Sequence, residues 1–225
     1  MKKATAIALL LAPFTATADE SGQLVPREHC TPLYTVQKRG CVAEHVLRCE
    51  TPDRVLFRNE FVEDGALMDV TFSDADYEFV DEWNAEGLKF ILGLVDNRDP
   101  FSLSSLRDTG VDVFDQTAMV DMQIVAPREA TILGDARLTG ETLALGGGVL
   151  EEVSVRATLN LSSMEIWMEG TSYVDRTTGT MFDGAYRMSI DGFDEELPGA
   201  PVEVLRDGDR GFMRNITLFD CGEPG

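Results

Sequence analysis

The sequence predicts a mainly β protein, an antiparallel β-sandwich or curved half-barrel with one or two short helices. Apolar and polar residues alternate over long runs, turn residues separate these runs, and few segments have a helical period. Strands joined by short turns pair in antiparallel fashion, and such a sheet can bury one face of each strand while the other contacts water. We therefore expect the sheet to occupy most of residues 30–221.

The clearest strand signal is the segment 149–161, where every odd position except Glu151 is apolar and most even positions are polar. The alternation continues over 164–168. A further alternating run, 182–190, follows turn residues at 176–179. Turn residues between two alternating runs indicate a β-hairpin.

Four shorter alternating runs complete the expected sheet. They are residues 118–126, 129–138, 141–145 and 211–221. Pro127 separates the first two runs, and Thr139–Gly140 separates the second from the third, because proline and glycine commonly interrupt strands.

The first expected helix runs from Ser73 to Gly87. Ser73 and Asp76 have the character of a capping box, and Tyr77 and Trp83 fall on one helical face. The same segment also fits a strand.

The second expected helix lies within residues 99–110. Asp99 is its predicted N-cap, Pro100 its first residue, and Gly110 follows its end. Between the two helices the apolar run 88–95 is typical of a buried strand.

The N-terminal residues have the order of a secretory signal peptide. Lys2 and Lys3 precede an apolar stretch, and small residues lead to an expected cleavage site after Ala18. We expect a signal peptide over 1–18 and a single exported β-rich domain over 19–225. No later apolar run approaches the roughly 18 residues that a membrane-spanning helix needs, so we expect no transmembrane span. The short Lys-rich signal and the excess of arginine over lysine favour a bacterial origin and a periplasmic or extracellular location.

The chain is strongly acidic, with a net charge of −21. Removal of the signal peptide leaves 17 basic and 40 acidic residues, a net charge of −23. A surface of this sign repels phosphate groups, so we expect no nucleic-acid partner.

The residue types disfavour several catalytic classes. His29 and His45 are the only histidines, and neither a G-x-S-x-G elbow nor an H-E-x-x-H motif occurs. We therefore expect no Ser–His–Asp triad, no metal centre and no cofactor. The acidic turns 191–196 and 207–209 lack the EF-hand pattern, and whether they bind calcium stays open.

We expect an exported, non-enzymatic β-protein that binds a small apolar ligand or a partner protein of the cell envelope. The predicted hairpin is rich in aromatic and sulfur-containing side chains that suit such a ligand, although the same residues also fit an ordinary core. These candidate ligand-binding residues are Met164, Trp167, Met168, Phe182, Tyr186 and Met188.

Two alternatives remain. The first is a carboxylate-based hydrolase of envelope polysaccharide, with Glu151 and Asp183 as its candidate acids, because glycoside hydrolysis requires two carboxyl groups across a cleft. The second is a structural or assembly protein of the cell envelope.

Cys41, His45 and Cys49 are evenly spaced by four residues, as metal ligands on a helix could be. On a helix the three positions would span about 12 Å, and on a strand about 26 Å, both too far for one tetrahedral zinc. An even number of cysteines in an exported chain favours disulfides instead.

A hairpin folded at Arg39–Gly40 would pair positions whose numbers sum to 79, which places Cys30 opposite Cys49. Cys41 is then left for Cys221. We predict the disulfides Cys30–Cys49 and Cys41–Cys221, with the other two connectivities still open.

Overall fold

A computed structural model describes residues 25–84, 89–92, 99–121, 126–162, 164–190, 192–197 and 199–222. The expected signal peptide over 1–18 lies outside the described residues.

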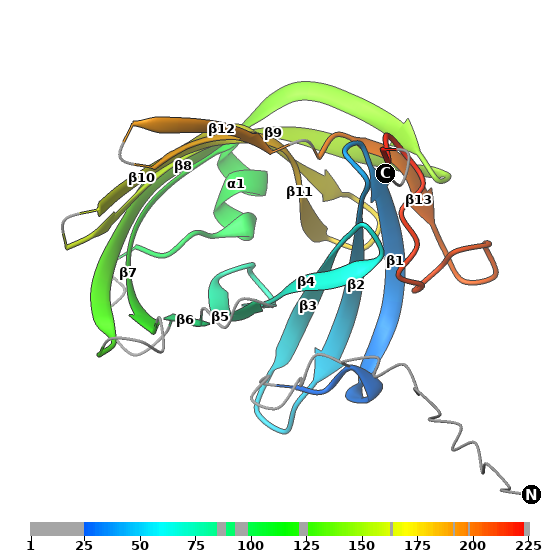
Figure 1. Cartoon of the computed structure of the whole chain (residues 1–225), viewed down its shortest axis with the longest axis horizontal. Helices are drawn as coiled ribbons and strands as arrows, with labels where there is room; N and C mark the ends of the chain where they lie inside the picture. The colour runs from blue at the N-terminus through cyan, green and yellow to red at the C-terminus, as the bar shows by residue number, and fades with distance from the viewer. Residues whose placement is uncertain are drawn as a thin grey trace, which may run out of the picture.

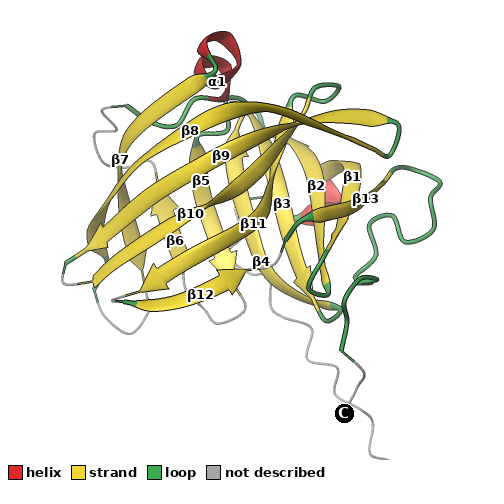
Figure 2. Ribbon diagram, turned by 90° about the horizontal axis from the view of Figure 1, so that it is seen from above, coloured by secondary structure: helices red, strands yellow, loops and turns green. Residues whose placement is uncertain are grey.

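In the described part of the chain, 13 antiparallel strands form one curled sheet (Figures 1 and 2). In chain order they are β1 (Cys30–Lys38), β2 (Val42–Glu50), β3 (Val55–Glu63), β4 (Ala66–Asp74), β5 (Phe79–Asn84), β6 (Lys89–Leu92), β7 (Val111–Asp121), β8 (Arg128–Leu145), β9 (Gly148–Leu161), β10 (Met164–Asp175), β11 (Thr180–Ile190), β12 (Phe193–Leu197) and β13 (Pro201–Leu205). Each strand from β1 to β11 pairs with the next strand along the chain, and β13 pairs with the free side of β1. The predicted mainly β class and antiparallel pairing are confirmed.

Among the described residues, β5 and β6 share one pair, Asp81 and Ile91. This junction separates two antiparallel six-stranded sections, β13 with β1–β5 and β7–β12, with β6 beside the second. The two outermost strands of the whole sheet are β12 and β13.

The predicted hairpin of residues 164–190 is confirmed as β10 and β11, joined by a turn at 176–179. The expected break at Thr139–Gly140 is wrong, because β8 runs without interruption from Arg128 to Leu145. A shift in the β8–β9 register between Leu138 and Thr142 absorbs these residues as a bulge, where Gly140 has φ +85°. Glycine tolerates this left-handed conformation and so permits the long strand to bend.

The expected helix from Ser73 to Gly87 is wrong, and its alternative, a strand, describes the segment better. The Asp74 carboxylate accepts hydrogen bonds from the backbone N–H groups of Asp76 and Glu78, at 2.9 and 3.0 Å. These bonds form a tight turn from β4 into β5, because an aspartate side chain can stabilise a turn as readily as a helix start.

One α-helix is described, α1 (Leu103–Thr109), and it begins later than the sequence predicted. Its N-cap is Ser102, whose hydroxyl oxygen accepts from the backbone N–H of Ser105 at 3.0 Å, whereas Asp99 forms a backbone bridge to Asp115. Gly110 ends the helix as predicted. A 3-10 turn, η1 (Arg27–His29), precedes β1, and no helix among the described residues is long and apolar enough to span a membrane.

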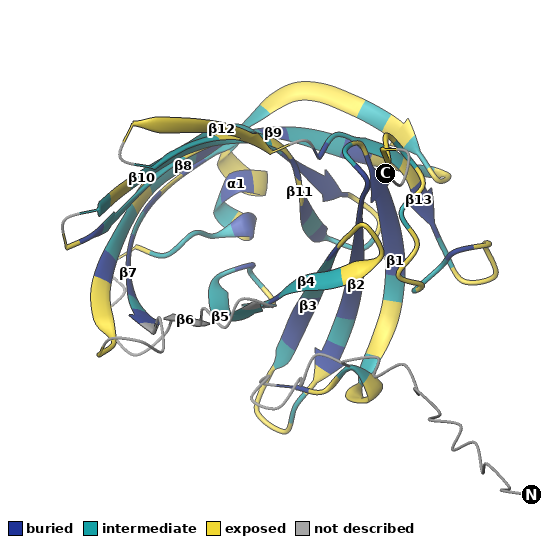
Figure 3. Cartoon of the chain, viewed as in Figure 1, coloured by how far each residue is buried: buried dark blue, intermediate teal, exposed yellow. Residues whose placement is uncertain are grey.

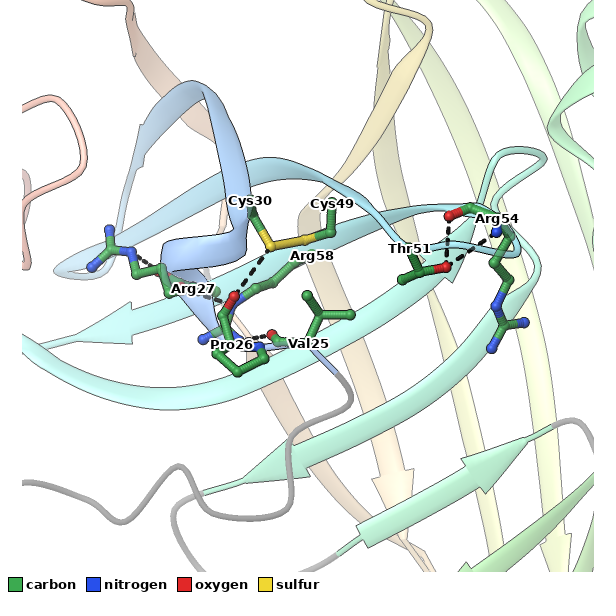
Figure 4. Close-up of a disulfide and its surroundings, with 9 residues drawn as sticks. Val25, Pro26, Arg27, Cys30, Cys49, Thr51, Arg54 and Arg58 are labelled. Carbon is green, nitrogen blue, oxygen red and sulfur yellow. Dashed lines mark hydrogen bonds and ion pairs between the residues drawn. A yellow bond between two sulfur atoms is a disulfide. The ribbon is translucent and has the colours of Figure 1, made fainter.

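The predicted disulfides Cys30–Cys49 and Cys41–Cys221 are both present, and Figure 4 shows the first beside Pro26 and Arg58. They indicate an oxidising compartment. The predicted register, in which the numbers of paired positions sum to 79, holds only at the end of the hairpin away from the turn. Lys38 pairs with Val42 rather than with Cys41, and a bulge between Pro32 and Tyr34 restores the alignment of the cysteines.

The expected strand over 211–221 is wrong: these residues form turns and bends that lie over β1. Gln37 Nε2 donates to the Ile216 carbonyl at 2.8 Å, and the Met213 N–H donates to Thr35 Oγ1 at 2.9 Å. Side chains rather than a backbone ladder hold this segment, because the edge of β1 is already paired with β13.

The tip of the β10–β11 hairpin packs inside the curl, so both of its faces are buried (Figure 3). Tyr173 belongs to a cluster with Tyr34 and Phe182, whereas its neighbour Val174 packs with Leu106 of α1. Successive strand residues point in opposite directions, so this tip connects the inner faces of β1–β2 to the helix.

Candidate functional site

The concave face of β7–β11 carries rows of apolar side chains. One row crosses five strands, from β7 to β11. It begins with the polar residue Gln116 of β7, and strand pairing then places one apolar residue from each following strand beside the last: Ile132, Leu159, Ile166 and Ile190. The next row on the same face includes Phe114, Ala157, Met168 and Met188. All these apolar residues except Phe114 are only partly buried, so they form an apolar surface that water still reaches.

Helix α1 lies on the inner side of the curl in Figure 1 and at one end of the strands in Figure 2. Leu103 and Leu106 of the helix pack against Ala136 and Val153, which share the face with the apolar rows. Just before the helix, Phe101 meets Phe114 edge to face, with ring centroids 5.9 Å apart. These contacts show that the rows lie on the helix side of the sheet.

The strands β1–β3 present a polar group on the inside of the curl. Lys38 and Glu44 form a fully buried ion pair, and Asn59 Nδ2 donates to the other Glu44 oxygen at 2.8 Å. The Lys38 ammonium also lies 5.9 Å and 5.8 Å from the ring centroids of Phe61 and Phe182. Burial raises the pKa of Glu44, and Lys38 opposes this effect.

Glu82 of β5 is a candidate acid that sequence reasoning missed. It pairs with Thr71, which places it on the same inner face as Asn59. Burial raises its pKa to about 8, and the negative charges of Asp69, Asp81 and Asp183 add to that effect. The acidic residues of 78–82 did not indicate an acid with a raised pKa, because sequence periodicity does not identify which carboxyl group the fold shields from solvent.

The six predicted ligand-binding residues do not form one group. Met164, Met168, Tyr186 and Met188 share the concave parity, whereas Trp167 lies on the opposite face of β10. Phe182 is buried in the hairpin tip, where its ring meets those of Tyr34 and Tyr173. The positions that complete the concave surface, Ile132 and Leu159 among them, come from strands that sequence reasoning did not connect to the hairpin.

Tyr186 combines an apolar ring with a bonded hydroxyl. The hydroxyl contacts Ser172 Oγ and donates to Asp183 Oδ1 at 3.2 Å. Burial, followed by the charge of Asp183, raises the pKa of this phenol. Tyr186 is therefore a neutral hydrogen-bonding group at the border between the apolar rows and the acids of the interior.

The two acids proposed for hydrolysis do not share a site. Glu151 forms an ion pair with Arg176, which lowers the pKa of the carboxyl group. Asp183 is exposed and hydrogen-bonded to Ser172 and Tyr186. A carboxylate held ionised by arginine cannot serve as a proton donor near neutral pH, so Glu151 is a poor candidate for the catalytic acid.

His45 lies on the outer face of β2, fully buried beneath the C-terminal segment. Its Nδ1 atom is 2.9 Å from Thr35 Oγ1, and burial, followed by the charge of Arg27, lowers its pKa to about 4. Cys41 and Cys49 are both in disulfides, so His45 has no cysteine ligand beside it.

Over the residues described, no group of three or more His, Cys, Asp or Glu side chains is placed to hold a metal ion. In the turn 206–209, the Asp209 carboxylate accepts from the backbone N–H of Arg206 at 2.8 Å. In the other acidic stretch Asp194 pairs with Arg187 at 2.7 Å, and Asp191 lies outside the described residues.

A surface groove of about 730 Å³ lies mainly along the convex face of β9–β12. Its lining includes the charged residues Arg156, Glu169, Arg187 and Glu196, and of the predicted ligand residues only Tyr186. The four charged side chains distinguish this groove from the concave apolar rows.

Comparison of the chain with protein-family models, curated proteins and solved structures found no match.

Proposed function

We propose that this protein is an exported, non-enzymatic β-protein that binds a small apolar ligand on the concave face of β7–β11. The observation that carries the proposal is the apolar row from Ile132 to Ile190, which stays partly exposed although it lies inside the curl. Covering such surface is favourable by roughly 25 cal/mol per Å². A periplasmic location agrees with the sequence of the signal region and with two disulfides.

The opposite wall supports an orientation for the ligand. Asn59, Thr71 and Glu82 present polar groups on the inner face of β3–β5. The inner face of β7–β11 is mainly apolar between α1 and the sheet edge, with Gln116 at its β7 end. A ligand with an apolar body would lie against Met168 and Met188 and direct any polar group toward β3–β5. Methionine side chains suit this task because they adapt to irregular shapes.

Titration with the uncharged fluorophore N-phenyl-1-naphthylamine tests the proposal. The variant Met188→Glu places a charge on the concave row, and Ser189→Glu places the same charge on the next residue of β11, on the opposite face. We expect at least a tenfold weaker Kd for Met188→Glu and an almost unchanged Kd for Ser189→Glu. Equal effects of the two changes, or no binding by the wild-type protein, would contradict the proposal.

Mass spectrometry of an organic extract supplies a second readout. Protein prepared from its native compartment without detergent should release an apolar molecule, and Met188→Glu should release less of it than Ser189→Glu. Equal yields from the two folded variants would place the ligand elsewhere.

A carboxylate-based hydrolase is the second candidate, and the environment of Glu82 favours it. Glu82 is partly buried, and a carboxyl group whose pKa is raised to about 8 is protonated at neutral pH and can donate a proton to a leaving group. Hydrolysis of a dye-labelled envelope polysaccharide should then stop in Glu82→Gln, and in the wild-type protein it should decline as pH rises past about 8. Activity that persists in Glu82→Gln would exclude this role.

A further inference from the structure

Strand β12 offers an unpaired edge of the sheet. It pairs with β11 on one side, and no described strand pairs with its other side. All five of its residues are exposed, and Figure 3 shows the strand in the colour of exposed residues. The N–H and C=O groups on the free side can therefore bond to a further extended chain.

The convex face of the sheet carries a ladder of alternating charge that ends on this strand. Strand pairing places Asp135, Arg156, Glu169, Arg187 and Glu196 side by side on β8 to β12, with the sign of the charge reversing at each step. Directly opposite residues of opposite charge stabilise a strand pair. A strand added beside β12 would therefore be stabilised by a cation opposite Glu196. The groove of about 730 Å³ follows the ladder to Glu196.

On the concave side, β12 ends the sheet with two apolar residues that flank Glu195, which is paired with Met188. The apolar row that contains Ile166 and Ile190 continues to Phe193, which is 82% exposed. The row that contains Tyr186 continues to Leu197, which is 37% exposed. Both apolar rows lack a neighbour at the edge, and an added strand with apolar residues there would cover them.

A second copy of this chain does not match the edge. Antiparallel pairing of two β12 strands would place Asp194, Glu195 and Glu196 of one copy against the same acids of the other, and like charges directly opposite are destabilising. The acidic edge thus selects against self-association and in favour of a basic partner.

We propose that β12 is a docking edge for an extended segment of another protein. The segment has three consecutive residues that include cations, and one apolar residue lies on each side of these three. The segment adds a strand beside Phe193–Leu197. Its cations meet Asp194, Glu195 and Glu196, and its apolar residues cover Phe193 and Leu197. The site is separate from ligand binding on the concave face and does not depend on it.

A synthetic peptide tests this edge directly. The probe Thr-Val-Arg-Lys-Arg-Val-Thr, blocked at both ends, has the matching order, and Arg-Thr-Val-Lys-Val-Thr-Arg has the same composition and charge in the wrong order. In fluorescence anisotropy we expect the first peptide to bind at least tenfold more tightly than the second. Equal affinities would show that only net charge attracts the peptide, and would overturn the proposal.

Backbone methylation distinguishes strand addition from side-chain contact. In a paired edge, alternate residues of the added strand direct their N–H groups toward the sheet. N-methylation of one alternate set in the peptide should therefore abolish binding, and N-methylation of the other set should leave it nearly unchanged. The same effect for both sets would contradict edge pairing.

Charge-reversal variants of the protein complete the test. Glu195→Lys with Glu196→Lys should weaken binding at least tenfold, whereas Glu28→Lys with Glu63→Lys makes the same change in net charge at two exposed positions away from β12. A peptide with glutamates in place of its cations should bind the first double variant and not the wild-type protein. Equal loss in both double variants, or a wild-type dimer that the β12 variant dissociates, would overturn the proposal.

Discussion

Removal of the disulfide Cys41–Cys221 should destabilise this protein more than removal of Cys30–Cys49. The first bond joins residues 180 positions apart and the second joins residues 19 apart. In the chain-entropy model, a closed loop of that greater length contributes about 5 kcal/mol at 25 °C, and the shorter loop about 3 kcal/mol. The double variants Cys41→Ala with Cys221→Ala, and Cys30→Ala with Cys49→Ala, measure the two contributions separately.

The structure adds a local consequence to this difference. Cys221 anchors the segment that covers Thr35, Gln37 and His45 on the outer face of β1–β2. If the segment detaches more often without the bond, His45 becomes hydrated, and its pKa should move from about 4 toward its usual value of about 6.5. In the variant without Cys30–Cys49 the segment keeps its anchor, and the pKa should stay low.

Urea unfolding followed by circular dichroism gives the free energies, and NMR titration of the His45 ring gives the pKa. An equal decrease in the free energy of unfolding on loss of either disulfide would contradict the dependence on loop length. An equal rise of the His45 pKa in both variants would show that the C-terminal anchor is not what protects the ring.

Three further predictions concern buried charge. The pKa of Glu82 is raised from 4.5 to about 8, so its ionisation lowers stability as pH rises through that range. Glu82→Gln should therefore increase the free energy of unfolding at pH 7 by up to about 3 kcal/mol and have little effect at pH 4.5. An unchanged free energy of unfolding at pH 7 would show that the carboxyl group is hydrated. Lys38→Met leaves Glu44 buried without its partner and should cost about 3 to 5 kcal/mol in urea unfolding at pH 7, most of which Lys38→Met with Glu44→Leu should restore. The pKa of His45 is lowered, so the unfolded chain binds the His45 proton at a higher pH than the folded chain, and stability falls as pH decreases from about 6.5 toward 4. Relative to His45→Gln, the wild-type protein should lose about 2 kcal/mol of unfolding free energy between pH 7 and pH 5. Parallel pH profiles of the two proteins would contradict the low pKa.

Local pattern predicted the parts of the fold that depend on neighbouring residues. Alternation over 149–161 and turn residues at 176–179 indicated β9, β10 and β11, because a strand with one wet face needs no information beyond its own sequence. The cysteine spacing predicted both disulfides, although Cys30 lies opposite Cys49 only because the bulge between Pro32 and Tyr34 corrects a one-residue shift at the turn.

Local pattern failed where a distant segment changes the outcome. Asp74 could cap a helix or form a turn, and the pairing of β4 with β5 decided for the turn. Residues 211–221 alternate like a strand, yet β13 already occupies the edge of β1, so they cross its face as an irregular segment.

The sequence by itself determined an acidic, disulfide-bonded antiparallel β protein and the composition of its Met-rich hairpin. The tertiary structure alone decided which side of that hairpin faces inward, and so separated Trp167 from Met168, which are adjacent in the chain. The tertiary structure also raises the pKa of Glu82 and places β12 at the edge of the sheet, where the charge ladder ends at Glu196. The physical reason is that burial and edge position depend on how the whole sheet curls, and contacts between strands far apart in the sequence set that curl.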